Sequence, residues 1–475
     1  MLNSIFGQFV VILPEISLVL LALFSQLSAL FFSNRIKIIT NITVIILFIL
    51  LAYTFCGLTD WMVSFNNSFA TGRGIGIYKA IVLLFSIMTI VIYKDYCQIA
   101  QQEFKFEFIT LILLSTMSSF AAISSRNFLL LFCSLELQAL ISYVLAGFSI
   151  NNLKSSEGAL KYFVLGALIS CLSLFGISYI YGFGGGLDYT YIFDAMRGMR
   201  QPNIGLVVGM VLFLSSIFFK LSVVPLHVWT PDVYEGSPIP AVTYFSASTK
   251  FANLVVLLNI IILAENYKPI SMSLIKILAI LSMFIGAGGA LRQNSLKRLM
   301  GYSTILNIGY VLIGVSLAGN SWSSKAALLY MIIYAISVIG FFSCLIALLG
   351  DKADTATFED LQGLASTRKA LAGGITIIMF SLIGIPPLAG FFGKYFLFYQ
   401  AIIHQQFTLA IIGIGSSVVA AYYYLKIVKS MYFVEIKQGH AYSSITSSLS
   451  LKFMNCLVIA FLLLFSVVFI FAILT

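Results

Sequence analysis

Four ionisable residues stand inside long apolar stretches of the sequence: Glu136, Lys220, Lys250 and Lys394. Each lies near the middle of its stretch, so its side chain cannot easily reach water if the stretch spans a membrane. A charge at mid-membrane depth costs about 2.5–3.5 kcal/mol on insertion scales, and such residues usually face a bundle interior or a hydrated cavity. One carboxylate and three amines at this depth predict a path for protons or cations.

The chemistry of these groups suits proton transfer. Burial favours the neutral form of a lysine, whereas a nearby carboxylate favours the ammonium, so moving a partner charge would move a proton. Glu136 is the deepest carboxylate, and Lys250 ends the hydroxyl-rich run YFSASTK, whose side chains could hold a water chain. The alternatives are structural: a neutral carboxyl in a fixed hydrogen bond, a permanent ion pair at Lys220, or a Lys250 side chain that snorkels to the interface.

Three further titratable residues lie closer to the predicted membrane edges. His227 follows Lys220 by seven residues, two turns along if the helix continued, and could link the buried lysines to the inner surface. A polar histidine at a loop entrance is an equally good explanation. Lys161 in SEGALKYF is better explained as a membrane anchor. Glu15 is better explained as an acid near a helix N-terminus, where the helix dipole favours negative charge.

Transmembrane helices must position these residues. Of the 475 residues, 60% are hydrophobic and 9% are charged, and the mean hydropathy is +1.03. Apolar runs recur from end to end, which predicts an all-α polytopic membrane protein and excludes a large soluble domain. The net charge of +10 does not indicate nucleic-acid binding, because the lysines and arginines lie in short loops and at helix ends.

Nothing in the sequence predicts a cofactor or metal site. The six cysteines are scattered without a CxxC pair, and the three histidines lack the spacing of helical-bundle ligands. The glycines at 184–186 follow no strand and precede no GK[ST], so they do not form a phosphate-binding loop. We therefore expect no redox centre in this chain.

The apolar stretches predict about fourteen membrane spans. Their ranges are 8–31, 36–57, 75–94, 106–124, 127–149, 157–182, 203–228, 237–263, 271–291, 298–318, 323–349, 370–404, 406–432 and 452–474. With these spans, sixteen of the 27 lysines and arginines fall on one side of the membrane, eight fall on the other, and three lie within it. The positive-inside rule then places both termini outside.

Two of the predicted spans contain prolines beside a lysine. Pro225 lies five residues after Lys220, and the pair Pro386–Pro387 precedes Lys394 in SLIGIPPLAGFFGKYF. Proline removes a backbone donor and clashes with the preceding turn, so each helix should break there. A membrane tolerates broken backbone only where protein or water satisfies the freed groups, so each break should face inward beside its lysine.

The two broken spans are five spans apart, which predicts two inverted five-helix repeats. Broken helices at matching positions of two halves usually indicate a transport site. The predicted divisions are 1–105 for the first three helices, 106–265 and 266–435 for the repeats, and 436–475 for the last helix. The sequence match between the halves is limited to FFK at 218–220 and FFGK at 391–394.

Several segments resemble the antiporter-like subunits of respiratory complex I, and among them the subunit N family, called subunit 2 in mitochondria. They are LELQALISYVL (135–145), SSEGALKYFVLGALIS (155–170), FKLSVVPLHVWTPDVYEGSPIPAVTYFSASTK (219–250), SLKRLMGYSTILNIGYVLIGV (295–315), FEDLQGL (358–364), SLIGIPPLAGFFGKYFLF (381–398) and AAYYYLKIVKSMYF (420–433). The resemblance covers nearly the whole chain, and the segment 219–250 is highly specific.

The resemblance implies a role for each buried charge. In this family a glutamate of the fifth span and a lysine of the seventh form a coupled pair, which the lysine of the eighth span connects to that of the twelfth. The matching residues are Glu136, Lys220, Lys250 and Lys394, with His227, Lys161 and Tyr423 as further members. One departure is Asn307, where many relatives have a histidine. Since asparagine cannot accept and release a proton at neutral pH, a titrating role is in doubt there.

The resemblance also implies a function and a location. The chain would be a proton-translocating membrane-arm subunit of NADH:quinone oxidoreductase, driven by quinone reduction in other subunits. NADH, FMN, iron–sulfur clusters and quinone would belong to partner subunits, which include a neighbouring antiporter-like subunit, and membrane lipids would surround the chain. The membrane would be a bacterial or mitochondrial inner membrane. The alternatives are a subunit of a multi-chain Na⁺/H⁺ antiporter and a scaffold whose buried charges only lock helices.

Overall fold

The computed structural model describes residues 9–31, 36–56, 61–198, 203–263, 268–434 and 448–474. Its helices are α2 (Leu13–Phe31), α3 (Ile36–Cys56), α4 (Arg73–Ile99), α5 (Phe106–Ser124), α6 (Phe128–Ala146), α7 (Leu153–Gly184), α8 (Tyr189–Gly198), α9 (Ile204–Leu221), α10 (Trp229–Gly236), α11 (Ile239–Tyr244), α12 (Lys250–Leu263), α13 (Lys268–Leu291), α14 (Leu296–Val315), α15 (Ser321–Leu349), α16 (Leu364–Thr367), α17 (Lys369–Ile383), α18 (Ala389–Ile403), α19 (Phe407–Phe433) and α20 (Leu449–Leu474). A π-helical turn, Phe245–Thr249, joins α11 to α12. The strands β1 (Met62–Ser64) and β2 (Phe69–Thr71) form an antiparallel hairpin.

The predicted all-α polytopic architecture is confirmed. Within the described ranges, twelve helices are long and apolar enough to cross a membrane, or thirteen if the bent pair Glu359–Thr367 and Lys369–Ile383 is one span. The predicted span 370–404 is not one helix, because the chain breaks it into α17 and α18 of fifteen residues each. The predicted last span corresponds to α20. The difference from fourteen therefore comes from the broken twelfth span and from α20, of which only Leu449–Phe465 is counted, and not from a missing element.

Asparagine and serine side chains define where many helices begin. The Asn127 carbonyl oxygen accepts hydrogen bonds from the backbone N–H groups of Leu129 and Leu130 at the start of α6. Asn152, Asn203, Ser295 and Asn320 cap α7, α9, α14 and α15 in the same way. An N-cap oxygen satisfies an N–H group that has no partner within its own helix. These short polar residues explain how helices start in a chain with few charges.

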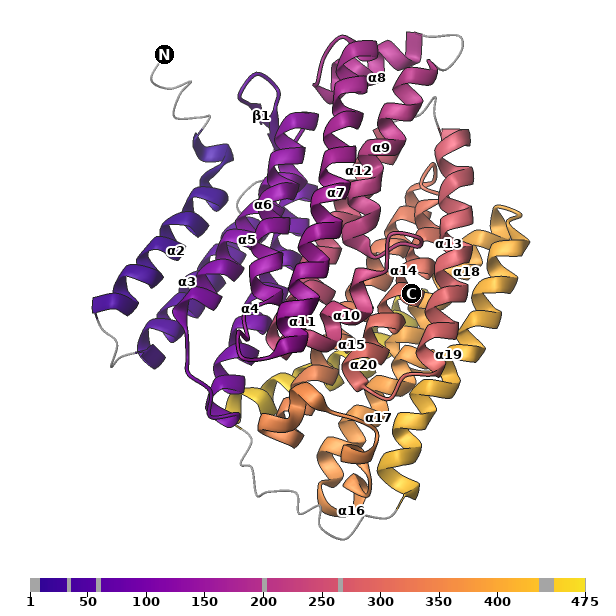
Figure 1. Cartoon of the computed structure of the whole chain (residues 1–475). Coiled ribbons are helices and arrows are strands. Elements are labelled where there is room, and N and C mark those ends of the chain that lie inside the picture. The colour runs from indigo at the N-terminus through magenta and orange to yellow at the C-terminus, as the bar shows by residue number, and fades with distance from the viewer. Residues whose placement is uncertain are drawn as a thin grey trace.

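The middle of the bundle is formed by α11–α12, α14 and α15. In the most apolar window of each of these spans, 89% of the residues are buried inside the protein, compared with 33% for α2, α3 and α7. Figure 1 shows α2 and α3 at one edge of the bundle and α18 and α19 at the other. Helices that are apolar on all sides are typical of membrane spans, and the outer ones keep large apolar side chains for lipid or partners.

The first break follows α9. The helix ends at Leu221, and Ser222 adopts a left-handed backbone conformation with a φ of 65°. The Val223 N–H donates to the Phe218 carbonyl at 2.9 Å, which closes the helix end. A cis peptide bond, Val224–Pro225, follows. The helix therefore breaks before Pro225, as predicted from the proline, and covers only part of the predicted span 203–228.

The second break follows α17 and has the same geometry. Here Gly384 is left-handed with a φ of 92°, and the Ile385 N–H donates to the Phe380 carbonyl at 3.0 Å. The cis bond is Pro386–Pro387. The helix end, the left-handed residue and the cis proline are each 162 residues beyond their counterparts in the first break, as in Leu221 and Ile383.

This spacing corrects the predicted match between the halves. A separation of 162 residues places Pro225–Leu226 on Pro387–Leu388, whereas the predicted match of FFK with FFGK requires a different spacing. The predicted match failed because it relied on residue identity, while the two segments share a backbone shape. The repeat boundaries at 106–265 and 266–435 remain a prediction.

Candidate functional site

Lys220 and Glu136 lie on neighbouring helices without forming an ion pair. Lys220, 8% exposed in the last turn of α9, donates from Nζ to the Leu135 carbonyl of α6 at 2.8 Å. The carboxylate of Glu136, the next residue of α6, accepts a hydrogen bond from Ser170 of α7 at 2.7 Å. Among the described residues no carboxylate lies within 4 Å of Lys220. The permanent ion pair considered as an alternative is therefore not present.

Glu136 lies at the contact of α6 with α7 and not deep inside the bundle of the isolated chain. The residue is half-buried, and the neighbouring Leu137 and Leu140 are exposed on the same helix. On the inward face of α6, Gln138 is buried and Leu135 contacts Lys220. Because α6 is apolar on every side, the sequence did not indicate which side faces inward. A carboxylate facing hydrocarbon is costly, so this side of α6 and α7 suits a protein partner.

Lys250 lies at the first break, at the start of α12. It is fully buried, and its Nζ donates to the Ser222 hydroxyl at 2.6 Å and to the Leu221 carbonyl at 3.2 Å. The amine also lies 5.7 Å from the ring centre of Trp229. These contacts hold the side chain inside the bundle and contradict the snorkelling alternative. The break that was predicted to lie beside Lys220 is in fact lined by Lys250.

Lys394 takes the equivalent place at the second break. It is 5% exposed on α18, and its Nζ donates to the Ile383 carbonyl, the last of α17, at 2.9 Å. Its amine lies 5.2 Å from the ring centre of Tyr310. In both breaks a buried lysine therefore binds the carboxyl end of a half-helix, where the partial negative charge of the helix dipole stabilises an ammonium.

His227 is placed differently from its predicted position, whereas Tyr423 is buried. His227 lies in the loop between α9 and α10 and is half-buried, with no hydrogen-bond partner for Nδ1 among the described residues. The helical spacing to Lys220 is lost because α9 ends at Leu221. Tyr423 is 1% exposed within α19, with its ring centre 4.4 Å from that of Tyr424, and faces the interior of the second half.

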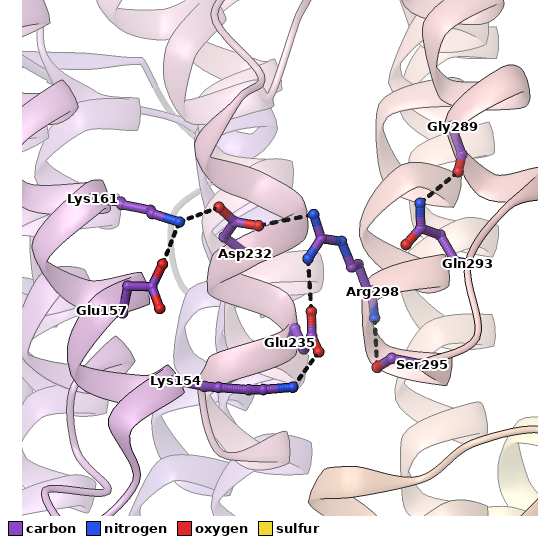
Figure 2. A network of polar contacts seen from close by, with 9 residues as sticks. All are labelled: Lys154, Glu157, Lys161, Asp232, Glu235, Gly289, Gln293, Ser295 and Arg298. Atoms are coloured by element: carbon purple, nitrogen blue, oxygen red, sulfur yellow. Dashed lines mark hydrogen bonds and ion pairs between the residues drawn. The ribbon is translucent and has the colours of Figure 1, made fainter.

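Lys161 belongs to an ion network that the sequence analysis missed. It is 42% exposed and binds Glu157 at 2.6 Å and Asp232 at 2.8 Å. The Arg298 guanidinium binds the carboxylates of both Asp232, at 3.2 Å, and Glu235, at 2.9 Å. Lys154 binds Glu235 at 2.7 Å, so the network links α7, α10 and α14 (Figure 2).

These side chains surround a cavity of about 290 Å³ at the ends of their helices. The signal in the sequence was the spacing of Asp232 and Glu235, which places both acids on one face of a helix. Since α10 follows the first break directly, the network fixes that segment to both halves of the chain.

The ion network should be sensitive to acid. Burial raises the pKa of Glu235, but the hydrogen bonds and charges of Lys154 and Arg298 together lower it below the ordinary value of 4.5. A lowered pKa contributes stability above the ordinary value, and this contribution is lost as the pH falls through the lowered value. We expect the thermal stability of the wild type to fall more steeply than that of Glu235→Gln as the pH drops below 4.5. The exposed Glu103→Gln serves as the control, and equal slopes for wild type and Glu235→Gln would contradict the prediction.

A buried ion pair between Glu15 and Lys79 was also missed. The Lys79 amine and the Glu15 carboxylate are 2.6 Å apart, with side-chain exposures of 1% and 8%. The amine also lies 5.5 Å from the ring centre of Phe69 and 5.6 Å from that of Phe120. Glu15 was interpreted as an acid near a helix N-terminus, and no role was predicted for Lys79. Sequence alone cannot reveal that their helices, α2 and α4, bring them together.

In the part of the chain that the structure describes, no group of three or more histidine, cysteine or acidic residues could hold a metal ion. The titratable side chains that the site brings together can bind and release protons. The site consists of buried amines on backbone carbonyls, a carboxylate at the bundle surface, and many buried hydroxyl groups.

Two proline-broken helices, each ended by a buried lysine within a polytopic bundle, define an antiporter-like membrane protein. Residues 125–420 match the family described as NADH:quinone oxidoreductase/Mrp antiporter, transmembrane. NADH-quinone oxidoreductase subunit N of Rickettsia felis is 58% identical over 458 residues, covering 95% of this chain and 98% of the relative. The subunit N of Rickettsia bellii is 56% identical over 460 residues with the same coverage.

A chain in the structure of respiratory complex I from Thermus thermophilus with bound aureothin has the same fold. It is similar with a TM-score of 0.76 and 26% identity, covering 94% of this chain and 96% of that chain. The chain described here belongs to the NADH:quinone oxidoreductase/Mrp antiporter membrane family, and within it to the subunit N relatives.

Proposed function

We propose that this chain is the subunit N of an NADH:quinone oxidoreductase and that it moves protons across an energy-coupling membrane. The observation that carries the proposal is the pair of breaks at which, among the described residues, Lys250 and Lys394 bind uncharged acceptors, Leu221 and Ser222 in one case and Ile383 in the other. A buried amine without a fixed counter-ion can change its charge when a neighbouring charge moves.

The proposed path runs from Glu136 through Lys220 and Lys250 to Lys394. Lys220 donates to the carbonyl of the residue before Glu136, so a movement of α6 changes its surroundings directly. Lys220 and Lys250 both lie at the end of α9, one within its last turn and one binding its last carbonyl. Loss of a proton from Lys250 would leave the Leu221 carbonyl and the Ser222 hydroxyl without their charged donor. Each lysine would thus alternate between ammonium and amine as its neighbour changes charge.

The partners follow from the same relatives and from the exposed side of α6. The half-buried carboxylate of Glu136 and its apolar neighbours suit contact with a neighbouring antiporter-like subunit and not with lipid alone. Quinone reduction, with NADH, FMN and iron–sulfur clusters, belongs in this proposal to other subunits. The membrane would be a bacterial or mitochondrial inner membrane, with both termini on its outer side.

The direct test is proton pumping by the assembled complex carrying Lys220→Ala or Glu136→Gln. We expect NADH oxidation to persist after detergent solubilisation while proton uptake per NADH falls in vesicles, because the relay loses a titrating group. Pumping by both variants at the wild-type ratio would contradict the relay. Copurification with NADH-oxidising, quinone-reducing subunits distinguishes this function from that of a multi-chain Na⁺/H⁺ antiporter.

The scaffold alternative is tested by a third variant. Lys250→Met removes the amine from the first break but keeps most of its apolar stem, so the bundle retains its packing. If the buried charges only lock helices, this variant should pump normally once assembled. We expect the opposite: normal assembly with a reduced ratio of protons to NADH.

A further inference from the structure

A second cavity, of about 380 Å³, lies at the end of the bundle where α4 and α8 begin and α5 and α12 end. The hairpin of β1 and β2 borders it, since Ala70 of β2 is one of the lining residues. Figure 1 shows β1 and α8 at this same end of the bundle. The volume is within the range of about 300–1,000 Å³ that is usual for sites of small molecules. In the predicted topology this end of the bundle is on the outer side of the membrane.

Apolar and aromatic side chains form much of the lining. They include Ile75, Ile123, Ile262, Tyr78 and Trp61. Trp61 and Ile262 are exposed, so the apolar surface continues from the cavity to the outside of the bundle. Tryptophan and tyrosine are enriched where a membrane meets water. This lining suits a hydrocarbon chain at the membrane edge.

One guanidinium, that of Arg126 between α5 and α6, lies at the cavity. The backbone N–H of Arg126 donates to the Ser68 carbonyl at 2.8 Å, and its carbonyl accepts from the Tyr189 N–H at 2.9 Å. The guanidinium carbon lies 5.5 Å from the ring centre of Trp61. The hairpin and α8 therefore hold this residue in place from two sides.

The positive charge of Arg126 is not neutralised within the described part of the chain. No carboxylate there lies within 4 Å of its guanidinium. Asp188, in the loop before α8, instead accepts a hydrogen bond from the Asn127 amide at 2.7 Å. Arg73, the first residue of α4, adds a second positive charge next to Gly74, which lines the cavity. The cavity thus combines an apolar lining with uncompensated positive charge.

A buried hydroxyl and a helix start add hydrogen-bond donors to the same cavity. Ser124 lines the cavity and is 1% exposed, and its hydroxyl has no hydrogen-bond partner among the described residues. Gly74 and Ile75 line it from the first turn of α4, whose N-cap residue, Gly72, provides no side-chain hydrogen bond. The first N–H groups of a helix lack partners within the helix and, with the helix dipole, favour an anion. Both observations indicate a ligand that accepts hydrogen bonds and carries negative charge.

We infer that this cavity binds an anionic phospholipid of the outer leaflet, with its phosphate at Arg126 and an acyl chain against the isoleucines. A guanidinium binds phosphate oxygens through two parallel N–H···O hydrogen bonds. The Ser124 hydroxyl and the start of α4 supply further donors. A free phosphate ion would leave Ile75 and Ile123 uncovered, and a zwitterionic lipid would bring its own ammonium group toward the arginines. The lipid joins the hairpin, α4 and α12 at this end of the bundle.

The test uses the assembled complex in phosphatidylcholine nanodiscs that contain a trace of a photoactivatable lipid. The probe is either phosphatidylglycerol or phosphatidylcholine, and mass spectrometry maps the labelled peptides. We expect phosphatidylglycerol to label residues 61–78 and 123–126 in excess of phosphatidylcholine. Arg126→Gln should lower this excess about tenfold, which corresponds to about 1.4 kcal/mol of binding free energy. The matched control is Lys325→Gln, because the Lys325 amine lies 4.8 Å from the ring centre of the exposed Trp322 but does not line the cavity. This control should keep the wild-type excess.

Gly74→Leu fills the cavity without removing a charge. A Cβ atom at this position meets nothing within 4 Å, so the larger side chain has room and the complex should assemble normally. We expect the excess of phosphatidylglycerol label to disappear in this variant, which also decides the question if Arg126→Gln fails to assemble.

Equal labelling by the two lipids in the wild type, or no labelling at the cavity because a partner subunit covers it, would overturn the lipid site. A wild-type excess in Gly74→Leu would do the same. Loss of the label on addition of inorganic phosphate would identify a site for a free anion and would also overturn it. Because labelling and not pumping is measured, a failure of the proposed lysine relay would leave this result unchanged.

Discussion

Lys79→Met should destabilise the subunit by about 3–5 kcal/mol, because it leaves the Glu15 carboxylate buried without its counter-charge. The carboxylate is 8% exposed, and one of its oxygens already has no hydrogen-bond partner among the described residues. The cost should appear as a lower thermal midpoint of the purified complex and as less assembled subunit in the membrane.

The ion pair between Glu15 and Lys79 should stabilise the fold by less than the loss of one partner destabilises it. Charged partners that leave water together regain only part of the desolvation energy, so replacing both is often neutral. The double variant Glu15→Gln with Lys79→Met should therefore recover most of the stability. Lys94→Met on the same helix is the matched control, because its amine binds Asn41 in an exposed contact. Equal stability of Lys79→Met and Lys94→Met would show that the buried pair has no structural role.

Among alanine substitutions at the glycines of the second half, Gly390→Ala should lower the stability of the subunit most. A Cβ atom at this position would collide with the backbone carbonyl of Ser381, where α17 and α18 approach each other around the break. The Gly390 N–H also donates to the Ser381 hydroxyl at 3.1 Å. Backbone cannot rotate away as a side chain can, so we expect a loss of about 1–3 kcal/mol or more.

The same substitution should also lower proton uptake per NADH, because Lys394 follows Gly390 by one turn and binds the last carbonyl of α17. Gly415→Ala on α19 is the control, since nothing lies within 4 Å of its added methyl group. That change should be neutral or stabilising by about 0.5–1 kcal/mol, because alanine favours helix more than glycine does. Normal stability and pumping by Gly390→Ala would show that the halves of this span need not approach so closely.

The membrane spans and the two breaks were predictable because both depend on local properties of the chain. Twenty apolar residues span a bilayer whatever surrounds them, and proline breaks a helix through its own ring and its missing N–H group. The same reasoning predicted that lysines lie at the breaks. It paired Pro225 with Lys220, its neighbour in sequence, whereas the first break is lined by Lys250 from a different helix.

The sequence could not predict which side of each helix is buried, because apolar residues occur on nearly every side of α6, α7 and α14. Glu136 lies at the bundle surface while Gln138, two residues later, is buried. The Asp232 network and the Glu15–Lys79 pair likewise depend on which helices pack together. In a soluble protein an amphipathic pattern indicates the inward face, but lipid removes that pattern.

By itself the sequence determined an all-helical membrane bundle, its buried titratable residues and the positions of its two broken helices, since hydropathy and proline geometry act over a few residues. Only the tertiary structure decided which lysine binds which helix end, which carboxylate lies near the bundle surface and which acids and bases form ion pairs. Those contacts join residues that are distant along the chain, so they depend on how whole helices pack and not on any local pattern.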